Sequence, residues 1–472
     1  MISHICISDL HAGALTSLLN DLPGQSGERS GVTTAFADAL GAFLGEAADG
    51  PQKPQLILLG DVLDLQFSPR ELAVETATGF LKALSDTDRL ASKVIATAGN
   101  HDHALWSDAR LGLHATDAAK GAAERNPTEA TLAFTETEAA KSRLLDTVLK
   151  RAGFDGADFR YPNIGFGDTS RAVLLHHGHF VEPPYRLMSV IKDWLHGPRV
   201  TVSTEDLSAE NAGWIDFAWS SFGDAAGLGR DAEQLYQNML TTQGFRRLSK
   251  AWSPKIADAL AEALPMSGHP TLRRVLGTLS QVGLDASLGK YRDTERFHEG
   301  EALTHGGLEG LRWYLEKPAR SQLDEELKGV PKDLTFVFGH THKPFASRIT
   351  VEKIPEVIKV YNTGGWTLNG PRLDTAEGAG LLLISDALDV ALVRIFKTPD
   401  NGKIREAYVE MLLTSSASSA AFKSDIETWL RNTSEAWKAL AEAARVAYEK
   451  RQRLLLSLTG DKSRDLTIRA AE

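Results

Sequence analysis

Five short stretches of this chain are rich in side chains that can bind metal ions. They offer aspartate, asparagine or histidine, and they contain eight of the 14 histidines: SDLH (8–11), GDVLD (60–64), GNHDH (99–103), HHGH (176–179) and GHTH (339–342). Carboxylate, imidazole and amide oxygen suit Mn, Fe, Zn or Ni, and a site so rich in charge needs cations to be tolerated. Each stretch alone could be a turn or a helix cap. Five of them in order predict a metal site.

Each polar stretch follows or ends a short apolar run that indicates a buried strand. These runs are HICIS (4–8), QLILLG (55–60), KVIATAG (93–99), RAVLLHH (171–177) and LTFVFG (334–339). Amphipathic stretches at 33–49 and 68–84 separate the first three runs, and this alternation is typical of a mostly parallel sheet covered by helices. Sites in such folds form outside the carboxyl ends of the strands, so we expect the five stretches to meet there.

The remaining sequence indicates a division into a core, an insertion and a tail. Further strands are predicted at 357–364, 379–385 and 390–396, and a polar helical stretch at 103–155. Amphipathic helices are predicted at 185–197, 231–252 and 307–317. We expect a discontinuous core (1–180 and 331–415), a helical insertion (181–330) and a C-terminal helical segment (416–472). The last segment is expected to pack on the core or on a partner subunit, which leaves a homo-oligomer open.

Composition narrows the class of protein. The 472 residues are 42% hydrophobic and 24% charged, enough for a large core in two or three units. The net charge of −10 disfavours non-specific binding to nucleic-acid phosphates. The single cysteine, Cys6, permits no internal disulfide and no cysteine-based zinc site. No apolar run is long enough to span a membrane and no leader peptide is evident, so a cytoplasmic location is expected.

The ordered motifs DxH, GDxxD, GNHD, HGH and GHxH resemble those of the calcineurin-like metallophosphoesterase family. The resemblance covers roughly residues 1–110, 158–180 and 333–400. It implies a four-layer α/β sandwich, here with a large helical insertion and a helical C-terminal segment. It also implies two divalent metal ions, Mn first, with Fe, Zn or Ni as alternatives.

Matched position by position, the resemblance implies a role for nine residues. Asp61 would bridge both metals, His101 would contact the phosphoryl group or protonate the leaving oxygen, and Asp64 would orient His101. The implied ligands of the first metal are Asp9, His11 and His342, and those of the second are Asn100, His177 and His340.

The implied function is hydrolysis of a phosphoester by a metal-bound hydroxide, on a small phosphomonoester or phosphodiester. The alternatives are a nuclease acting on DNA or RNA and a non-catalytic binding module. Protein Ser/Thr phosphatases typically carry GDxHG and RGNHE where this chain has SDLHAG and AGNHD, which disfavours that branch. UDP-diacylglucosamine hydrolases typically carry arginine in place of His101, which disfavours that branch too.

Several roles stay open in the sequence. His177 is preferred to His176 as the ligand because it directly precedes the glycine of HGH, and His176 is expected to pack at the strand end. His103 and His179 are candidates for supporting the ligands, and Asp102 for holding its turn. Both ends of the insertion are tethered beside the expected metals, so we expect it to cover them as a lid. A packing or dimerisation module is the alternative.

Overall fold

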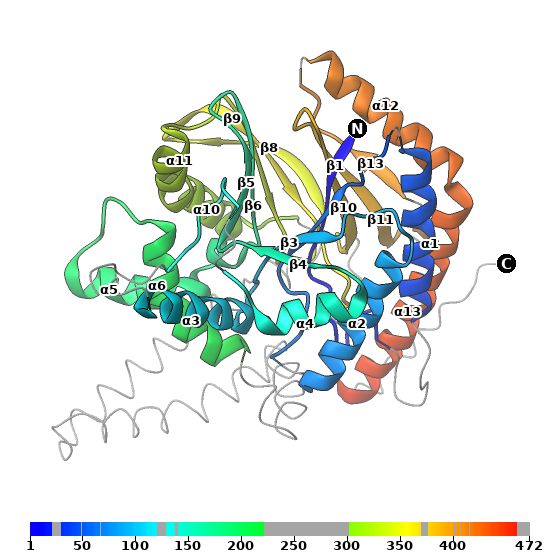
Figure 1. Cartoon of the computed structure of the whole chain (residues 1–472), viewed down its shortest axis with the longest axis horizontal. Helices are drawn as coiled ribbons and strands as arrows, with labels where there is room; N and C mark the ends of the chain where they lie inside the picture. Colours follow the sequence, from blue (N-terminus) through cyan, green and yellow to red (C-terminus); the bar gives the residue numbers. More distant parts are fainter. Residues whose placement is uncertain are drawn as a thin grey trace.

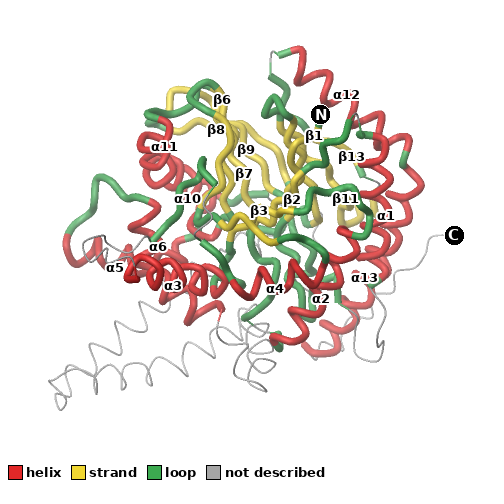
Figure 2. Tube along the Cα trace, viewed as in Figure 1, coloured by secondary structure: helices red, strands yellow, loops and turns green. Residues whose placement is uncertain are grey.

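Two β-sheets lie face to face at the centre of the computed structural model, with helices on the outer side of each (Figure 1). These four layers confirm the expected α/β sandwich, and Figure 2 shows the strands gathered between the helices. The structure describes residues 1–20, 30–48, 50–66, 68–119, 129–136, 140–220, 302–369, 376–400, 403–405, 407–414 and 416–459.

The first sheet has eight strands and a parallel centre. Strands β1 to β4 run parallel, whereas β10 pairs with β1 and β11 pairs with β10 in antiparallel fashion. A short strand, β13 (Tyr408–Glu410), also pairs with β11. The spatial order is β12 (Lys403–Arg405), β11 (Val390–Asp400), β10 (Gly378–Ser385), β1 (Ile2–Ile7), β2 (Gln55–Leu59), β3 (Lys93–Thr97) and β4 (Gly156–Phe159).

The second sheet has five strands, and its centre is also parallel. Strands β6, β7 and β9 run parallel, and β5 and β8 close the two edges as antiparallel partners. The spatial order is β5 (Asn163–Gly167), β6 (Arg171–His176), β7 (Asp333–Phe338), β9 (Ile354–Asn362) and β8 (Phe345–Val351).

The central strands are apolar throughout because both of their faces are buried. Successive side chains in a strand point to opposite faces. In β2, Ile57 and Leu59 face the second sheet and contact the cluster around Val173 of β6, whereas Leu56 and Leu58 join the outer cluster that includes the helices. This burial on two faces explains why the continuous apolar runs predict these strands correctly.

The helices cover the outer faces of the sheets. Helices α1 and α13 lie along the first sheet, and α10 and α11 lie beside the second (Figure 1). The helices are α1 (Gly31–Glu46), α2 (Arg70–Ser85), α3 (Ala104–Ala119), α4 (Arg143–Ala152), α5 (Leu187–His196), α6 (Thr204–Ile215), α10 (His305–Tyr314), α11 (Arg320–Leu327), α12 (Ala417–Asn432) and α13 (Ser434–Thr459). Short 3₁₀ turns at His179–Val181 (η1) and Pro183–Arg186 (η2), and π-helical turns at Asp216–Ser220 and Leu315–Ala319, extend or link the helices of the insertion.

The C-terminal helices pack on the core, which is one of the two arrangements expected for this segment. Trp437 and Tyr448 of α13 are buried, and their rings lie 6.0 Å from Phe43 of α1 and 5.9 Å from Phe396 of β11. The Arg451 guanidinium is buried too and donates hydrogen bonds to the carbonyls of Ser17 and Asn20. Helix α13 therefore also holds the loop that follows the first polar stretch.

The predicted helical stretch at 103–155 is wrong in its middle. Residues 104–119 and 143–152 are helical, but the described residues 129–136 are not. Backbone groups of this segment bond to other parts of the chain: Thr131 N–H donates to the Tyr161 carbonyl and Ala133 N–H donates to the Glu326 carboxylate. These partners from distant segments replace the bonds of a helix.

Of the other predicted helices and strands, some are confirmed and others are not. The helices expected at 185–197 and 307–317 are confirmed by α5 and α10, whereas the one expected at 231–252 lies outside the described residues. Strands β4, β5 and β8 were not predicted, because they are short or edge strands without a continuous apolar run. Within the described ranges, no helix combines the length and the hydrophobicity that crossing a membrane requires.

Candidate metal centre

The nine predicted site residues lie together at the carboxyl ends of five parallel strands. Asp9 and His11 follow β1, Asp61 and Asp64 follow β2, and Asn100 and His101 follow β3, all in the first sheet. His177 follows β6 and His340 and His342 follow β7 in the second sheet. All nine side chains are buried. The parallel register of each sheet brings these strand ends to one edge, as expected for an α/β fold.

The first group of potential ligand atoms comes from Asp9, His11 and His342, and these atoms lie within 4.8 Å of one another. His342 Nε2 is 3.4 Å from Asp9 Oδ1 and 3.0 Å from His11 Nε2. Ligand atoms that each lie about 2.1 Å from one ion stand about 3 Å apart when they subtend a right angle. The spacing of this group is therefore that of ligands around a single small cation.

The second group comes from Asp61, His177 and His340, whose ligand atoms also lie within 4.8 Å of one another. Asn100 joins this group, because its side-chain oxygen is 3.2 Å from His177 Nε2. The four side chains belong to loops after β2, β3, β6 and β7, so both sheets contribute to this group.

Asp61 lies between the two groups. Its Oδ2 atom is 3.5 Å from His11 Nε2 and 3.3 Å from His177 Nε2, one histidine from each group. This buried oxygen accepts no hydrogen bond from any residue that the structure describes, whereas Oδ1 accepts the His101 backbone N–H at 2.7 Å. A buried carboxylate oxygen without a donor is costly unless a cation neutralises it.

In their neutral forms, which bind metal ions, three imidazoles of the site present lone pairs to its centre. His177 Nδ1–H donates to the Leu59 carbonyl at 2.9 Å, so its Nε2 carries the lone pair that faces Asn100. His11 Nδ1 is likewise held by Asp64 at 3.2 Å, and His342 Nδ1 by Asn369 at 2.7 Å. The inward Nε2 atoms then face one another and carboxylate oxygens, and either shared protons or metal ions can lie between these facing atoms. The residues therefore fit divalent metal ions.

Several residues of the site have strained backbone conformations with positive φ angles. Eight non-glycine residues of the described chain have positive φ angles, and five of them are Asp9 (52°), His11 (45°), Asp61 (51°), His340 (68°) and His342 (60°). Positive φ is costly for residues with a Cβ and clusters at functional sites, where the surrounding structure enforces it.

Two glycines leave room for the carboxylates. A Cβ atom at Gly99 would lie 2.2 Å from Asp61 Oδ1, and one at Gly339 would lie 2.3 Å from Asp9 Oδ2. Any larger residue would push these carboxylates out of place. The glycines of GNHD and GHTH thus permit the close approach that the two ligand groups need.

The charges of the site favour ionised carboxylates. Burial alone would raise the pKa of Asp61, but the neighbouring His177 and His101 outweigh it and hold that pKa well below its ordinary value. For Asp9 burial is likewise outweighed, by the hydrogen bond with His342 and the charge of His177, and its pKa falls to about 2. Anionic carboxylates and neutral imidazoles are the forms that bind metal ions.

His101 and Asp64 form a pair beside the first group. Asp64 Oδ2 is 3.2 Å from His101 Nδ1 and also 3.2 Å from His11 Nδ1, so one carboxylate orients two imidazoles. Burial opposes the charge of Asp64, but the nearby His101 and His11 hold its pKa below its ordinary value. The contact between Asp64 and His11 was not anticipated from the sequence.

Asp102 holds the turns of the second and third polar stretches together. Its carboxylate is fully buried and accepts the backbone N–H groups of Gly99 (2.7 Å), Asp61 (3.2 Å), Val62 (2.8 Å) and Leu63 (3.3 Å). Its side chain therefore fixes the two loops that carry Asp61 and Asn100.

The remaining histidines of the motifs have other contacts. His176 accepts the Gly178 N–H at 2.8 Å and packs against Tyr314, as expected for a residue at the strand end. His103 contacts none of the predicted ligands: it lies 2.7 Å from Asp216 Oδ1 and 3.0 Å from the Tyr161 hydroxyl. That hydroxyl is also 3.2 Å from His179 Nε2.

Two residues that the sequence did not single out also reach the centre. Glu182 Oε1 is 3.5 Å from His340 Nε2, and the Tyr185 hydroxyl accepts the Asn100 side-chain N–H at 3.4 Å. Both follow HHGH closely, in the stretch FVEPPY (180–185). Their position soon after a motif was the only feature of the sequence that could have indicated this role. The contacts themselves are visible only in the folded chain.

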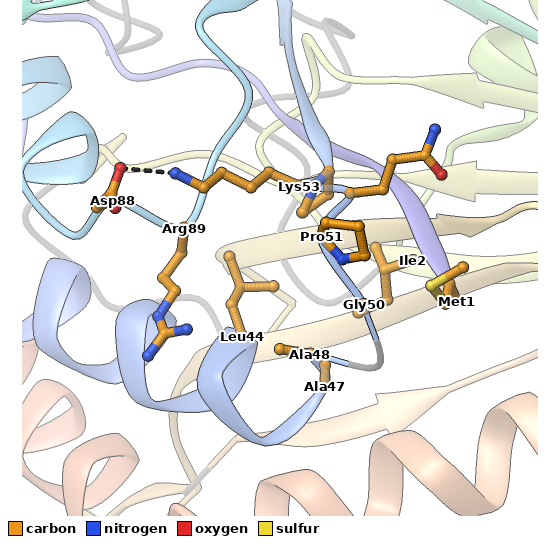
Figure 3. A pocket seen from close by; sticks show the side chains of 12 residues that line it. Met1, Ile2, Leu44, Ala47, Ala48, Gly50, Pro51, Lys53, Asp88 and Arg89 are labelled. Carbon is orange, nitrogen blue, oxygen red and sulfur yellow. Dashed lines mark hydrogen bonds and ion pairs between the residues drawn. The ribbon is translucent and has the colours of Figure 1, made fainter.

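A surface pocket lies at the opposite ends of the strands. Its lining includes Met1, Leu44, Lys53 and Arg89, near the amino ends of β1 and β2 (Figure 3). Lys53 forms an ion pair with Asp88 across its rim at 2.6 Å. None of the predicted site residues lines this pocket, so it lies apart from the candidate metal centre.

Comparison with known families agrees with this geometry. The sequence model of the family described as calcineurin-like phosphoesterase matches residues 4–220. No curated protein sequence matches the chain. The matched segment contains seven of the nine predicted site residues, and the loop after β7 supplies the other two. Residues 4–220 of the chain are therefore similar to the calcineurin-like phosphoesterase family, and the described site residues form groups that could hold metal ions.

Proposed function

We propose that this protein is a dinuclear metal-dependent hydrolase of small phosphoesters. The observation that supports this best is the buried Asp61 oxygen between His11 of one ligand group and His177 of the other. A carboxylate in that position can bridge two ions. A non-catalytic binding module would not need this arrangement together with an oriented histidine beside it.

In this proposal each ion has its own set of ligands. Asp61 would be shared between the two ions. The first ion would be held by Asp9, His11 and His342, and the second by Asn100, His177 and His340. We take Mn as the working metal, with Fe, Zn or Ni as alternatives, because these ions bind mixed carboxylate, imidazole and amide ligands.

In the proposed reaction, the metal ions and the protein side chains have different roles. When bound, the two ions supply an activated hydroxide and neutralise the charge of the phosphoryl group. Asp64 holds the Nδ1–H of His101, which leaves His101 Nε2 to contact a phosphoryl oxygen or, when protonated, to donate a proton to the leaving oxygen. The buried protein groups around the site limit the access of bulk water.

A small substrate is favoured over nucleic acid by charge. The net charge of −10 opposes binding to a polyanion by its backbone. The alternative, a nuclease acting on DNA or RNA, would use the same metals and the same in-line displacement.

A substrate panel distinguishes these possibilities. The purified protein with Mn is assayed on phosphomonoesters, phosphodiesters and oligonucleotides, with the Asp61→Asn variant as a control for contaminating activity. We expect turnover of a small ester by the wild type only. Faster cleavage of long DNA or RNA than of any small ester would favour the nuclease. Mn binding without turnover on the whole panel would favour the binding module.

A further inference from the structure

The two ligand groups differ in what holds them. The first group is supported by the core: Asp64 holds His11, and both Asn369 and Thr367 hold His342 at 2.7 and 2.8 Å. Two of the four side chains in the second group, Asn100 and His340, contact a different part of the chain. That part begins directly after HHGH, at the start of the predicted insertion.

Tyr185 contacts both of these ligands. Its hydroxyl accepts the Asn100 Nδ2–H at 3.4 Å, and its ring stands edge-on to His340 with the ring centres 5.0 Å apart. The tyrosine is buried and packs against Trp219, 4.6 Å away between ring centres. It therefore links two ligands of the second group to Trp219.

The hydroxyl of Tyr185 anchors the side chain of Asn100; because a hydroxyl can both donate and accept, it restrains the position of the amide. With Nδ2 directed at Tyr185, the side-chain oxygen points at His177 Nε2 and can bind the metal. If the amide turned over, an N–H would point at that nitrogen and donate a hydrogen bond to it. The metal would then lose a ligand oxygen, so the position and orientation of the Asn100 side chain matter for the site, and Tyr185 helps to hold that side chain in place.

Glu182 has the matching role for His340. Its carboxylate is buried and lies 3.5 Å from His340 Nε2, which favours a proton on that nitrogen and leaves Nδ1 with a lone pair. The turn that carries both residues is rigid, because Pro183 and Pro184 fix its φ angles and Trp214 of α6 donates a hydrogen bond to the Pro184 carbonyl at 2.8 Å.

We infer that Glu182 and Tyr185 are positioning residues for the second metal ion, so that the start of the insertion governs occupancy of one half of the centre. This inference rests on the proposed dinuclear function. Partners behind a metal ligand typically change metal affinity about 10- to 100-fold when removed. The effect should fall on the second ion, since the side chains that the two residues contact, Asn100 and His340, are its ligands in the proposal.

Mn binding to the metal-stripped full-length protein tests this inference by calorimetry. The variants are Tyr185→Phe and Glu182→Gln. The matched controls are Tyr361→Phe, which removes a buried hydroxyl bonded to Val390 and Leu412, and Glu326→Gln, which alters a carboxylate bonded to Ala133. Neither control contacts a predicted ligand.

The wild type and both controls should bind two Mn ions. In each test variant, one binding event should weaken about 10- to 100-fold and the other should stay within about twofold. At limiting Mn, the electron paramagnetic resonance spectrum of the variants should be that of an isolated ion, whereas the wild type shows a coupled pair.

Other results would overturn the inference. Equal weakening of both events, or unchanged binding in both test variants, would show that Glu182 and Tyr185 do not act on the second ion. A wild type that binds only one Mn ion would instead refute the dinuclear proposal on which the inference rests. The two failures are therefore distinguishable in the same titrations.

Discussion

Asp61 is the residue on which both ligand groups depend. It has positive φ, it is fully buried, and one of its oxygens lies between His11 and His177. The other oxygen is already used by the His101 backbone N–H. A single carboxylate thus links two groups of ligands and the loop that carries the candidate catalytic histidine.

Asp61→Asn should abolish turnover and lower the metal content of the purified protein. The amide is neutral, so it cannot supply negative charge to two ions. Metal analysis and the ester assay measure the two effects. The control is Asp38→Asn, which neutralises an exposed carboxylate on α1. Two tightly held ions together with retained turnover would contradict the bridging role.

His101→Gln should lower the rate of hydrolysis without lowering the metal content. No ligand is removed, so metal content should stay near that of the wild type, while kcat falls about 10²- to 10⁴-fold, the usual scale of lost general acid catalysis. The loss should be smaller for an ester with a good leaving group, which needs less protonation. Equal losses for good and poor leaving groups would indicate that His101 stabilises phosphoryl charge and does not donate a proton.

Among the structural elements, the loops after the strands do the positioning. The strands end within a few residues of every predicted ligand, and side-chain acceptors such as Asp102 bind the loops to one another. Four backbone N–H groups from the loops after β2 and β3 converge on that one carboxylate. The loops therefore depend on buried polar contacts and not on apolar packing alone.

Asp102→Asn should destabilise the fold even without metal. An asparagine offers one acceptor oxygen, and its amide N–H would point at backbone donors, so several buried N–H groups lose their partner. We expect the free energy of unfolding to fall by about 2–3 kcal/mol. Urea denaturation in the presence of a chelator measures this, with Asp38→Asn as the control. A change below about 0.5 kcal/mol, typical of surface positions, would show that the carboxylate does not hold the loops.

At the scale of the whole molecule, segments far from the motifs in the sequence also make contacts with the core and the site. Helix α13 covers α1, and its Arg451 reaches the loop after β1, more than 400 residues earlier in the chain. The start of the insertion, at residues 182–220, reaches Asn100 and His340. The expected domain boundaries stay a prediction. The C-terminal helix contacts the core, and the start of the insertion contacts two of the predicted ligands.

Trp437→Ala should destabilise the core of the protein and not only helix α13. The indole is buried against Phe43 of α1, and removing a buried aromatic side chain costs about 3–5 kcal/mol. Thermal and urea unfolding, monitored by fluorescence and circular dichroism, measure the loss. Lys438→Ala alters an exposed neighbour on the same helix and serves as the control. Unfolding of α13 alone, with the sheets unaffected, would indicate an independent C-terminal unit.

Added Mn should stabilise the whole wild-type protein. An ion that binds only the folded state adds about 2.7 kcal/mol when its concentration is 100 times its Kd. The Tm of the metal-stripped protein should therefore rise with Mn concentration, and rise less for Asp61→Asn. A Tm that is insensitive to Mn would contradict metal binding at this centre.

The sequence by itself determined the strands that carry the site and the nine residues expected there. These features are local: a strand buried on two faces needs a continuous apolar run, and the ligand types stand directly after it. The choice between His176 and His177 also has a local basis, because His177 directly precedes the glycine of the HGH motif. His176 packs against Tyr314, whereas His177 faces Asp61.

Only the tertiary structure decided the contacts between distant segments. The loop at 129–136, the edge strands and the partners of the second ligand group depend on which surfaces meet, and a local pattern carries no information about that. Glu182 and Tyr185 looked like ordinary residues of a proline-containing turn. They became part of the centre because packing of the turn against Trp214 and Trp219 directs their side chains at His340 and Asn100.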